Sequence, residues 1–351
     1  MQMTTVLIVD DSRSVRDYLE HLIGSDPELQ IIGKVDNGRQ ALEFLARQRP
    51  DVITMDIQMP EMDGFETTRR IMETNPTPIV IISSLWSPGE VARTFQAMEA
   101  GAVSILQKPV GIAQPGHADS REELLASIRQ AAAAKVRRLR SLFRDAPQPA
   151  SRAPASDGTT QSIQVVAVGA STGGPPAIQQ LLATLPPTFP APILIVQHIA
   201  SGFTSGFVDW LGGTTRLPVR LAEDGQPLLP GQVYVAPEGT HLLFGPRGTA
   251  QLSNAPPEHA MRPAVSPLFR SVAQTRGRNG VGILLTGMGR DGAAELKLIR
   301  DAGGVTFAQD QATSVIHGMP GEAIKLDACT HILPPQEIAA MLINLAGATP
   351  L

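Results

Sequence analysis

One serine stands in a glycine-rich segment with the surroundings of a nucleophile. Ser171 lies in VVAVGASTGGPP, between an apolar run and a stretch that begins with glycines and prolines. This segment matches G-x-S-x-G, a strand-to-helix turn that exposes the serine hydroxyl. The free N–H groups and positive dipole at the start of the following helix suit an oxyanion. A similar turn also binds phosphates or dinucleotides, so the motif alone leaves both functions open.

A histidine and an aspartate follow two further apolar runs. His198 ends PILIVQH, and Asp291 follows VGILLTGMGR. If these runs are parallel strands, their carboxyl ends lie at the same edge of the sheet as Ser171. A neutral imidazole can accept the serine proton, and a carboxylate can orient it. We therefore predict a Ser171–His198–Asp291 triad. The α/β-hydrolase order Ser, Asp, His would use His317 instead, and this alternative stays open.

Three carboxylates follow strand-like runs near the N-terminus. Asp10 and Asp11 come after VLIV, and Asp56 comes after VITM. Clustered acids repel one another unless a cation lies among them, and hard oxygen ligands suit Mg²⁺. Lys108 follows VSIL and can pair with an added phosphoryl group, while Ser83 follows PIVII and offers a hydroxyl. The sequence therefore predicts a site for Mg²⁺ and a phosphoryl group.

Strands that alternate with helices must position these residues. In the first part of the chain we expect strands at 6–9, 30–35, 52–55, 78–82 and 103–106, and helices at 13–24, 38–47, 64–73, 88–99 and roughly 121–142. This alternation predicts a five-stranded parallel sheet with helices on both faces.

The alternation resumes after a segment rich in Pro, Ala and Ser at 145–161, which is typical of a linker. Beyond it we expect strands at 164–170, 192–198, 232–237, 280–287 and 304–308, and helices at 173–184, 203–212, 265–275, 291–302 and 335–346. The stretch 232–254 has strand signals without a helix and predicts a β-hairpin added to the parallel sheet. The second part is therefore a doubly wound, mostly parallel α/β domain with a hairpin.

Length and composition limit the classes of function. The 351 residues suggest two domains, and a net charge of −4 disfavours a nucleic-acid partner. The basic stretch KVRRLR (135–140) is more simply the end of a helix. No signal peptide or apolar run of about 18 residues indicates secretion or membrane insertion, so we expect a cytoplasmic protein. The only cysteine, Cys329, is expected to be a small buried residue.

The N-terminal motifs resemble those of a response-regulator receiver. DD, DIQMPEMDG, SS and KP occur in the receiver order over about 1–125. The resemblance implies a flavodoxin-like fold, a phosphoacceptor at Asp56, and Mg²⁺ held by that residue with Asp10 and Asp11. It also implies that Ser83 and Lys108 contact the phosphoryl group. A histidine kinase of the CheA type would supply that group.

One position departs from the receiver pattern. Receivers often have an aromatic residue three positions before the lysine, and here that residue is Ile105. The resemblance therefore does not carry the usual aromatic switch over to this chain.

The second half resembles the catalytic domain of the chemotaxis protein-glutamate methylesterases, the CheB family. GASTGG, VQHI, LPGQVYVAP, TGMGRDGA and VIHGMPGEA occur in the family's order across about 163–345. The family's triad maps onto Ser171, His198 and Asp291. Its oxyanion-binding groups map onto the backbone near Met288, with Thr172 beside the nucleophile.

A second departure lies in RPAVSPL (262–268). Ala264 and Ser266 stand where the family leads us to expect a Ser and an Asp. The resemblance therefore does not carry the family's lining of the substrate groove over to these two positions. We expect three regions: a receiver at 1–125, a helix and linker at 126–161, and a methylesterase domain at 162–351.

The resemblance implies a function for the whole chain. It is phosphorylation-activated hydrolysis of glutamate methyl esters, with deamidation of glutamines, on the cytoplasmic domains of chemoreceptors in two-component signalling. No cofactor is expected for the hydrolase itself. Two alternatives remain: a serine esterase acting on another protein or a small molecule, and a catalytically silent signalling module.

Overall fold

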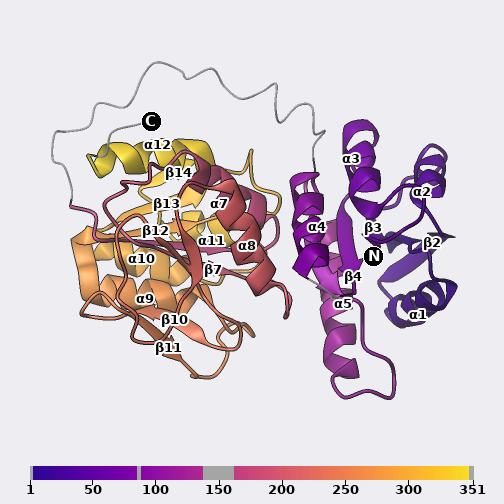
Figure 1. Cartoon of the computed structure of the whole chain (residues 1–351), viewed down its shortest axis with the longest axis horizontal. Coiled ribbons are helices and arrows are strands. Elements are labelled where there is room, and N and C mark those ends of the chain that lie inside the picture. Colours follow the sequence, from indigo (N-terminus) through magenta and orange to yellow (C-terminus); the bar gives the residue numbers. More distant parts are fainter. Residues whose placement is uncertain (1–2, 85–87, 137–161, 348–351) are drawn as a thin grey trace. The chain divides into compact units, whose positions relative to one another are not determined.

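The computed structural model describes residues 3–84, 88–136 and 162–347 (Figure 1). The chain divides into two compact units, Met1–Pro149 and Ala150–Leu351. The predicted linker at 145–161 and most of KVRRLR lie outside the described residues. Among the helices of the described ranges, none is long and apolar enough to cross a lipid bilayer.

The first unit is the predicted five-stranded parallel sheet, in the order β2-β1-β3-β4-β5. Its strands are β1 (Thr4–Val9), β2 (Leu29–Val35), β3 (Val52–Met55), β4 (Ile79–Ser83) and β5 (Ser104–Gln107). Its helices are α1 (Arg13–Gly24), α2 (Gly38–Leu45), α3 (Gly64–Thr74), α4 (Pro88–Glu99) and α5 (His117–Ala132). Helices α1 and α5 pack together, and α3 contacts both α2 and α4, so both sheet faces are covered. This explains why β3 and β4 are buried along their whole length.

Helix α5 differs from its predicted range, roughly 121–142. It begins at His117, after Gly116 with a φ of 83°, and ends at Ala132. Residues 133–136 are not helical. The helix packs against β3, β4, β5 and α1, and therefore belongs to the first unit. The predicted domain boundary at residue 125 falls inside it.

The second unit contains a seven-stranded sheet in the order β14-β13-β12-β6-β7-β9-β8, and every neighbouring pair is parallel. Its strands are β6 (Val165–Ala170), β7 (Ile193–Gln197), β8 (Val219–Leu221), β9 (Val233–Val235), β12 (Gly280–Leu284), β13 (Val305–Gln309) and β14 (His331–Leu333). Its helices are α7 (Gly174–Ala183), α8 (Thr204–Thr214), α9 (Val265–Arg276), α10 (Ala293–Asp301), α11 (Met319–Lys325) and α12 (Pro335–Leu345), with a short 3₁₀ turn η1 (Gly277–Asn279).

The two groups of helices give this unit its doubly wound character. Helix α7 contacts α8 and α12, while α10 contacts α9 and α11 (Figure 1). Because both faces of the sheet are covered, β6, β7 and β12 are entirely buried. They read as continuous apolar runs in the sequence for the same reason.

The predicted hairpin at 232–254 is corrected in one respect. Strand β9 joins the large parallel sheet, whereas β10 (His241–Phe244) and β11 (Ala250–Ser253) form a separate two-stranded antiparallel sheet. The hairpin packs on α9, where Leu242 and Phe244 enter the core of the unit. The Phe244 N–H donates to Ser271 Oγ of that helix at 2.8 Å. These contacts fix the hairpin on the helix layer and not on the sheet.

Candidate functional site

The strand order of the second unit reverses next to β6. The chain passes from β6 to β7 on one side and returns to β12 on the other. Ser171 directly follows β6, His198 directly follows β7, and Asp291 lies in the loop after β12. A crevice at such a reversal is where open α/β sheets bind ligands. The topology therefore brings the three predicted residues to one sheet edge.

Backbone hydrogen bonds continue past the ends of these strands. The His198 N–H donates to the Ala170 carbonyl at 2.9 Å, and the Ser171 N–H donates to the Thr286 carbonyl at 3.0 Å. The end of β6 at Ala170 is thus bonded to His198, and the next residue, Ser171, is bonded to the loop that leads to Asp291. The three segments are held in register at the edge itself.

His198 and Asp291 form a direct pair. His198 Nε2 lies 2.9 Å from Asp291 Oδ2, and the two side chains are 6% and 4% exposed. Burial by itself would raise the pKa of Asp291, but the hydrogen bond and charge of His198, aided by the Val265 N–H and the Ser266 hydroxyl, lower it to about 2. Asp291 is therefore a carboxylate at any working pH. Its contact with Nε2 leaves the other ring nitrogen of His198, Nδ1, available for a second partner.

The third member of the predicted triad, the Ser171 hydroxyl, is not hydrogen-bonded to the His198 imidazole. Within the described ranges, no hydrogen bond connects Ser171 Oγ with His198 Nδ1. Catalytic hydrogen bonds are often long or poorly aligned without substrate, so this geometry leaves the role of Ser171 open. The structure places the hydroxyl at the right edge and pairs the other two residues.

His317, the alternative base, lies at the same edge. It forms an isolated parallel bridge with Gly287, and its Nδ1 lies 3.2 Å from Ser314 Oγ. The carboxylate of Asp291 is engaged by His198. An Asp291–His317 pair would have to displace that contact, so the geometry favours His198 as the imidazole that Asp291 orients.

The two departures in RPAVSPL have different consequences. Ala264 is fully buried, and its N–H donates to His241 Nδ1 at 3.1 Å. Ser266 Oγ donates to Asp291 Oδ1 at 2.7 Å, and the Ser266 N–H donates to the same oxygen at 2.9 Å. Ser266 therefore holds the carboxylate of the pair. The sequence signalled only that this position was unusual, and not what it touches.

The residue predicted to be the oxyanion donor, Met288, lies in the loop after β12. The Gly287 N–H is used by the Ile316 carbonyl at 3.0 Å, whereas the Met288 N–H donates to no described residue. Thr172 is tied to the same loop, because Thr286 Oγ1 donates to its carbonyl at 3.0 Å. A Cβ on Gly287 would lie 2.7 Å from Ser171 Cβ, so the loop passes directly beside Ser171.

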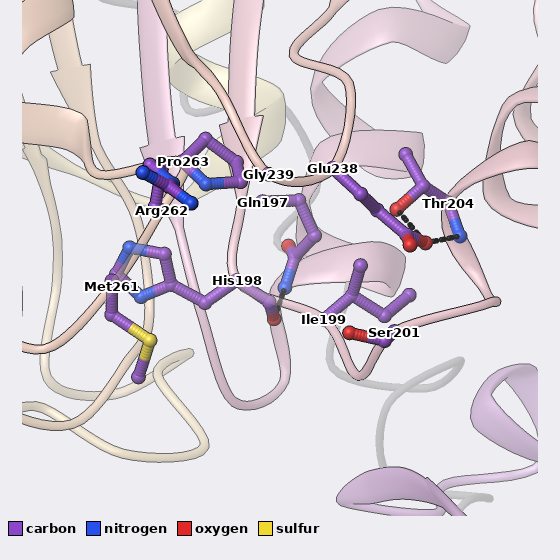
Figure 2. Close-up of a pocket in the computed structure, with 10 residues that line it drawn as sticks. All are labelled: Gln197, His198, Ile199, Ser201, Thr204, Glu238, Gly239, Met261, Arg262 and Pro263. Carbon is purple, nitrogen blue, oxygen red and sulfur yellow. Dashed lines mark hydrogen bonds between the residues drawn. The ribbon is translucent and has the colours of Figure 1, made fainter. Parts of the chain in front are cut away.

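A small cavity of about 70 Å³ opens beside His198 (Figure 2). Its wall combines apolar and charged groups, including Met261 and Arg262 near the imidazole and Glu238 opposite. Glu238 Oε1 accepts hydrogen bonds from the Gly202 N–H and the Thr204 hydroxyl, both at 2.8 Å. All of its lining residues belong to the second unit, and His198 is one of them.

The second predicted site lies in the first unit, where the strand order reverses between β1 and β3. Oxygen atoms of Asp10, Asp11 and Asp56 all lie within 4.8 Å of one another. Lys108 Nζ lies 2.8 Å from Asp10 Oδ2 and 3.2 Å from Asp56 Oδ2. Three convergent carboxylates of this kind fit Mg²⁺, which prefers hard oxygen ligands and retains several waters.

Burial governs the ionisation of this acidic group. It raises the pKa of Asp56 to about 6, against the opposing charge of Lys108. Burial alone would lower the pKa of Lys108, but Asp10 and Asp56 raise it. A cationic Lys108 therefore stands among the carboxylates.

The remaining predicted residues are placed as follows. Ser83 is the last residue of β4 and is buried, and its carbonyl accepts from the Lys108 N–H at 2.9 Å. Ile105 lies in β5 and is buried as well. Cys329 is only partly buried, unlike the expectation, but burial still raises the pKa of its free thiol to about 12 and keeps it protonated.

Known proteins match both units. Residues 166–342 match the CheB methylesterase family, and residues 6–115 match the response regulator receiver domain. A Geobacter metallireducens protein named protein-glutamate methylesterase/protein-glutamine glutaminase 4 is 51% identical, over 98% of this chain and 99% of its own length. A Syntrophus aciditrophicus protein named protein-glutamate methylesterase/protein-glutamine glutaminase 1 is 48% identical, over 99% of both chains.

A solved structure agrees with the second unit. The crystal structure of the Thermotoga maritima CheB methylesterase catalytic domain is 35% identical, with a TM-score of 0.51, and the match covers 52% of this chain and 99% of that one. The sequence match over half the chain, the full-length relatives and this structure agree on the family. The chain belongs to the CheB methylesterase family, with a response regulator receiver domain at its N-terminus.

Proposed function

We propose that this protein hydrolyses glutamate methyl esters, and deamidates glutamines, on the cytoplasmic domains of chemoreceptors. The observation that supports it most directly is the buried His198–Asp291 pair at the sheet edge that also bears Ser171. The names of the full-length relatives give the same two activities. Because the substrate is the cytoplasmic part of a receptor, we place the protein in the cytoplasm.

The acylation step follows from the orientation of His198. Ser171 Oγ attacks the carbonyl carbon of the glutamyl ester or amide, and His198 Nδ1 accepts the hydroxyl proton. The Met288 N–H, next to Thr172, donates to the oxyanion that forms. Collapse of this intermediate breaks the bond to the leaving group, which takes the proton from His198 and departs as methanol or ammonia. Asp291 stays ionised and stabilises the imidazolium between these transfers.

Deacylation repeats the same transfers with water. A water molecule attacks the glutamyl-serine ester while His198 Nδ1 accepts its proton. Release of Ser171 Oγ returns that proton to the serine and leaves glutamate as the product. The net reaction consumes one water for each ester or amide bond broken, and it uses only groups of this chain.

The receiver is proposed to control this activity. A carboxylate oxygen of Asp56 attacks the phosphorus of a phosphodonor, supplied in the cell by a histidine kinase of the CheA type. The bond between phosphorus and the donor breaks as the acyl phosphate forms, and the histidine side chain of the kinase, or acetate from acetyl phosphate, departs. Mg²⁺ held by Asp10, Asp11 and Asp56 would neutralise phosphoryl charge at the site. Lys108, already 3.2 Å from Asp56 Oδ2, would pair with the new phosphoryl oxygens, and Ser83 would offer them its hydroxyl. We propose a receiver domain at the predicted 1–125, extended to Ala132 because α5 packs on the receiver sheet, then a linker, and a methylesterase domain at 162–351.

The decisive experiment follows methanol release from methylated receptor, with and without Mg²⁺ and acetyl phosphate. We expect methanol release that increases with the phosphodonor. It should be absent in Ser171→Ala, and it should lose its response to the phosphodonor in Asp56→Asn, because an amide is no nucleophile for phosphorus. Hydrolysis of generic esters without any release from receptor would instead support an esterase with another substrate.

A further inference from the structure

A buried glutamine lies between the nucleophile and the base. Gln197 is the last residue of β7, stands directly before His198, and is 5% exposed. Its Nε2 donates to the Ser171 carbonyl at 2.9 Å and to the His198 carbonyl at 2.7 Å. Figure 2 shows the second of these bonds, with the side chain folded back over its own strand end. Both amide protons are therefore used by the backbones of the two proposed catalytic residues.

These bonds continue the sheet where its own ladder stops. The last backbone bond between the two segments joins the His198 N–H to the Ala170 carbonyl at 2.9 Å. One residue further on, β6 turns into the approach to α7, and β7 turns into the loop before α8. The Gln197 side-chain amide bonds both backbones at the point where the backbone-to-backbone hydrogen bonds end. It sets the distance between the Ser171 and His198 backbones after both have left the sheet.

The amide oxygen of Gln197 shows that a glutamine is not the most stabilising residue at this position. Gln197 Oε1 is buried and has no hydrogen-bond partner among the described residues. It occupies the space that a Cβ on Gly174 would fill, at 2.0 Å from that position. The next two residues, Pro175 and Pro176, have no N–H to offer it. A buried acceptor without a partner destabilises a fold, and an apolar side chain of similar shape would avoid that cost.

We propose that Gln197 is a positioning residue for the reaction. Its amide holds the Ser171 and His198 backbones in the relative position that lets the hydroxyl reach Nδ1. The inference rests on the proposed function, since it assigns Gln197 a role in the chemistry of those two residues. Displacement of reacting groups by about 1 Å can lower a rate by about 100-fold, so a side chain that touches neither the substrate nor the hydroxyl can still determine kcat.

The test compares substitutions that remove the two N–H donors. Gln197→Met keeps a similar volume, and Gln197→Glu keeps the shape but points a carboxylate at two carbonyl oxygens. In the full chain with Mg²⁺ and acetyl phosphate, we expect both variants to lower kcat on methylated receptor by about 100-fold with little change in KM. Labelling of Ser171 by a fluorophosphonate probe should slow in parallel. The melting temperature of Gln197→Met should stay near that of the wild type.

Gln232 offers a matched control at the opposite edge of the sheet. It precedes β9, and its Oε1 accepts from the Tyr234 hydroxyl at 3.2 Å. Gln232→Met also removes an amide next to a strand end, but far along the strand direction from Ser171. We expect its kcat and labelling rate to match those of the wild type.

Gly174 provides a second, independent perturbation. A Cβ there would collide with Gln197 Oε1 at 2.0 Å and displace the amide. Gly174→Ala should therefore lower kcat in the wild type but cause little further loss in Gln197→Ala, where the space is open. The same Cβ would also meet Ala170 Cβ at 2.9 Å, and this contact is present in both backgrounds, so it cancels in the double-mutant cycle.

The outcomes separate this inference from the function on which it rests. A wild type that labels at Ser171 beside a Gln197→Met that labels equally fast overturns the positioning role alone. So does a loss of kcat that follows the unfolded fraction, or one that adds independently to the effect of Gly174→Ala. A wild type that neither labels nor releases methanol overturns the proposed function and this inference together.

Discussion

The carboxylate of Asp291 has more partners than any other group in the proposed triad. His198 Nε2 and the Val265 N–H contact Oδ2, while the N–H and hydroxyl of Ser266 contact Oδ1. Such a set of donors fixes both the position and the charge of the carboxylate. It also couples the stability of the fold to the ionisation of one residue.

This coupling predicts a pH dependence. The pKa of Asp291 is lowered from 3.8 to about 2, so its stabilising contribution is present above about pH 3.8 and is lost as the pH falls through about 2. The contribution is on the order of 2 kcal/mol. In Asp291→Asn this part of the acid sensitivity should be missing. Urea unfolding of the fragment 162–351, followed by the fluorescence of its single tryptophan, Trp210, measures the difference.

The comparison is made between the wild-type fragment and Asp291→Asn at about pH 5 and about pH 2. We expect the difference in unfolding free energy between the wild-type fragment and Asp291→Asn to become smaller as the pH falls. A gap that stays constant over this range would show that the carboxylate is not stabilised in its charged form.

The choice between the two histidines is also decided at the level of single residues. Removal of a catalytic base should lower kcat by about 10⁴-fold or more, whereas a residue at the rim should affect mainly KM. We expect the first result for His198→Ala, because Asp291 orients that imidazole at 2.9 Å, and the second for His317→Ala. Steady-state rates on methylated receptor give the answer, with circular dichroism as the control for folding. The reverse pattern would favour the order Ser171, Asp291, His317.

Among the elements, the loop after β12 has the least room to change. A Cβ on Gly287 would lie 2.7 Å from Ser171 Cβ and 2.4 Å from Met319 Sδ. The methionine can move, but the serine is held by its own backbone bonds. Gly287→Ala should therefore displace either Ser171 or the loop after β12 and lower kcat by about 100-fold.

The matched control for this substitution is Gly213→Ala. Gly213 lies in α8, and a Cβ there would meet nothing within 4 Å. Alanine should leave kcat unchanged and stabilise the helix by about 0.5–1 kcal/mol. If Gly287→Ala were as active as Gly213→Ala, the loop would not be the close neighbour of Ser171 described above.

At the level of elements, the sequence predicts most of what positions the sites. The apolar runs before Ser171, His198 and Asp56 are buried parallel strands, and their ends locate the edges. The prediction that the hairpin joins the parallel sheet is wrong, because alternating apolar residues do not indicate whether a strand packs on a helix or pairs with a sheet. Helix α5 was predicted too long because its helical composition continues past the last residue that packs on the sheet.

Two contacts at the active site could not be predicted for a different reason. Gln197 and Ser266 act through bonds to residues 26 and 25 positions away in the chain. Such bonds depend on side-chain direction after the elements have packed, and no local pattern encodes that direction. In the sequence, Ser266 is marked only by its departure from the expected Asp, and Gln197 is marked only by its place in the VQHI motif.

At the level of the whole molecule, the second unit has a core of its own. Residues from the sheet, the hairpin and helices α9 to α11 form one buried cluster within it. We therefore expect the fragment 162–351 to fold without the receiver. If the unphosphorylated receiver blocks the active site, this fragment should release methanol from methylated receptor faster than the unphosphorylated full chain. Acetyl phosphate should raise the rate of the full chain and leave that of the fragment unchanged.

The outcome against this proposal is equally clear. A fragment no faster than its unphosphorylated parent would mean that the receiver does not act by blocking. The receiver would then have to act by another route, such as recruitment of the substrate, and the effect of phosphorylation should appear in KM.

The strand order of the second unit has a consequence for how such enzymes are classified. The proposed catalytic residues follow β6, β7 and β12, and these three strands are direct neighbours in the sheet. Their order along the chain, Ser, His, Asp, therefore reflects only the order in which the chain visits these three strands. A circularly permuted chain that began between β7 and β12 would carry the same side chains in the order Asp, Ser, His, with every contact at the edge retained. Residue order thus traces the ancestry of a fold, while the chemistry depends on which strand ends are adjacent.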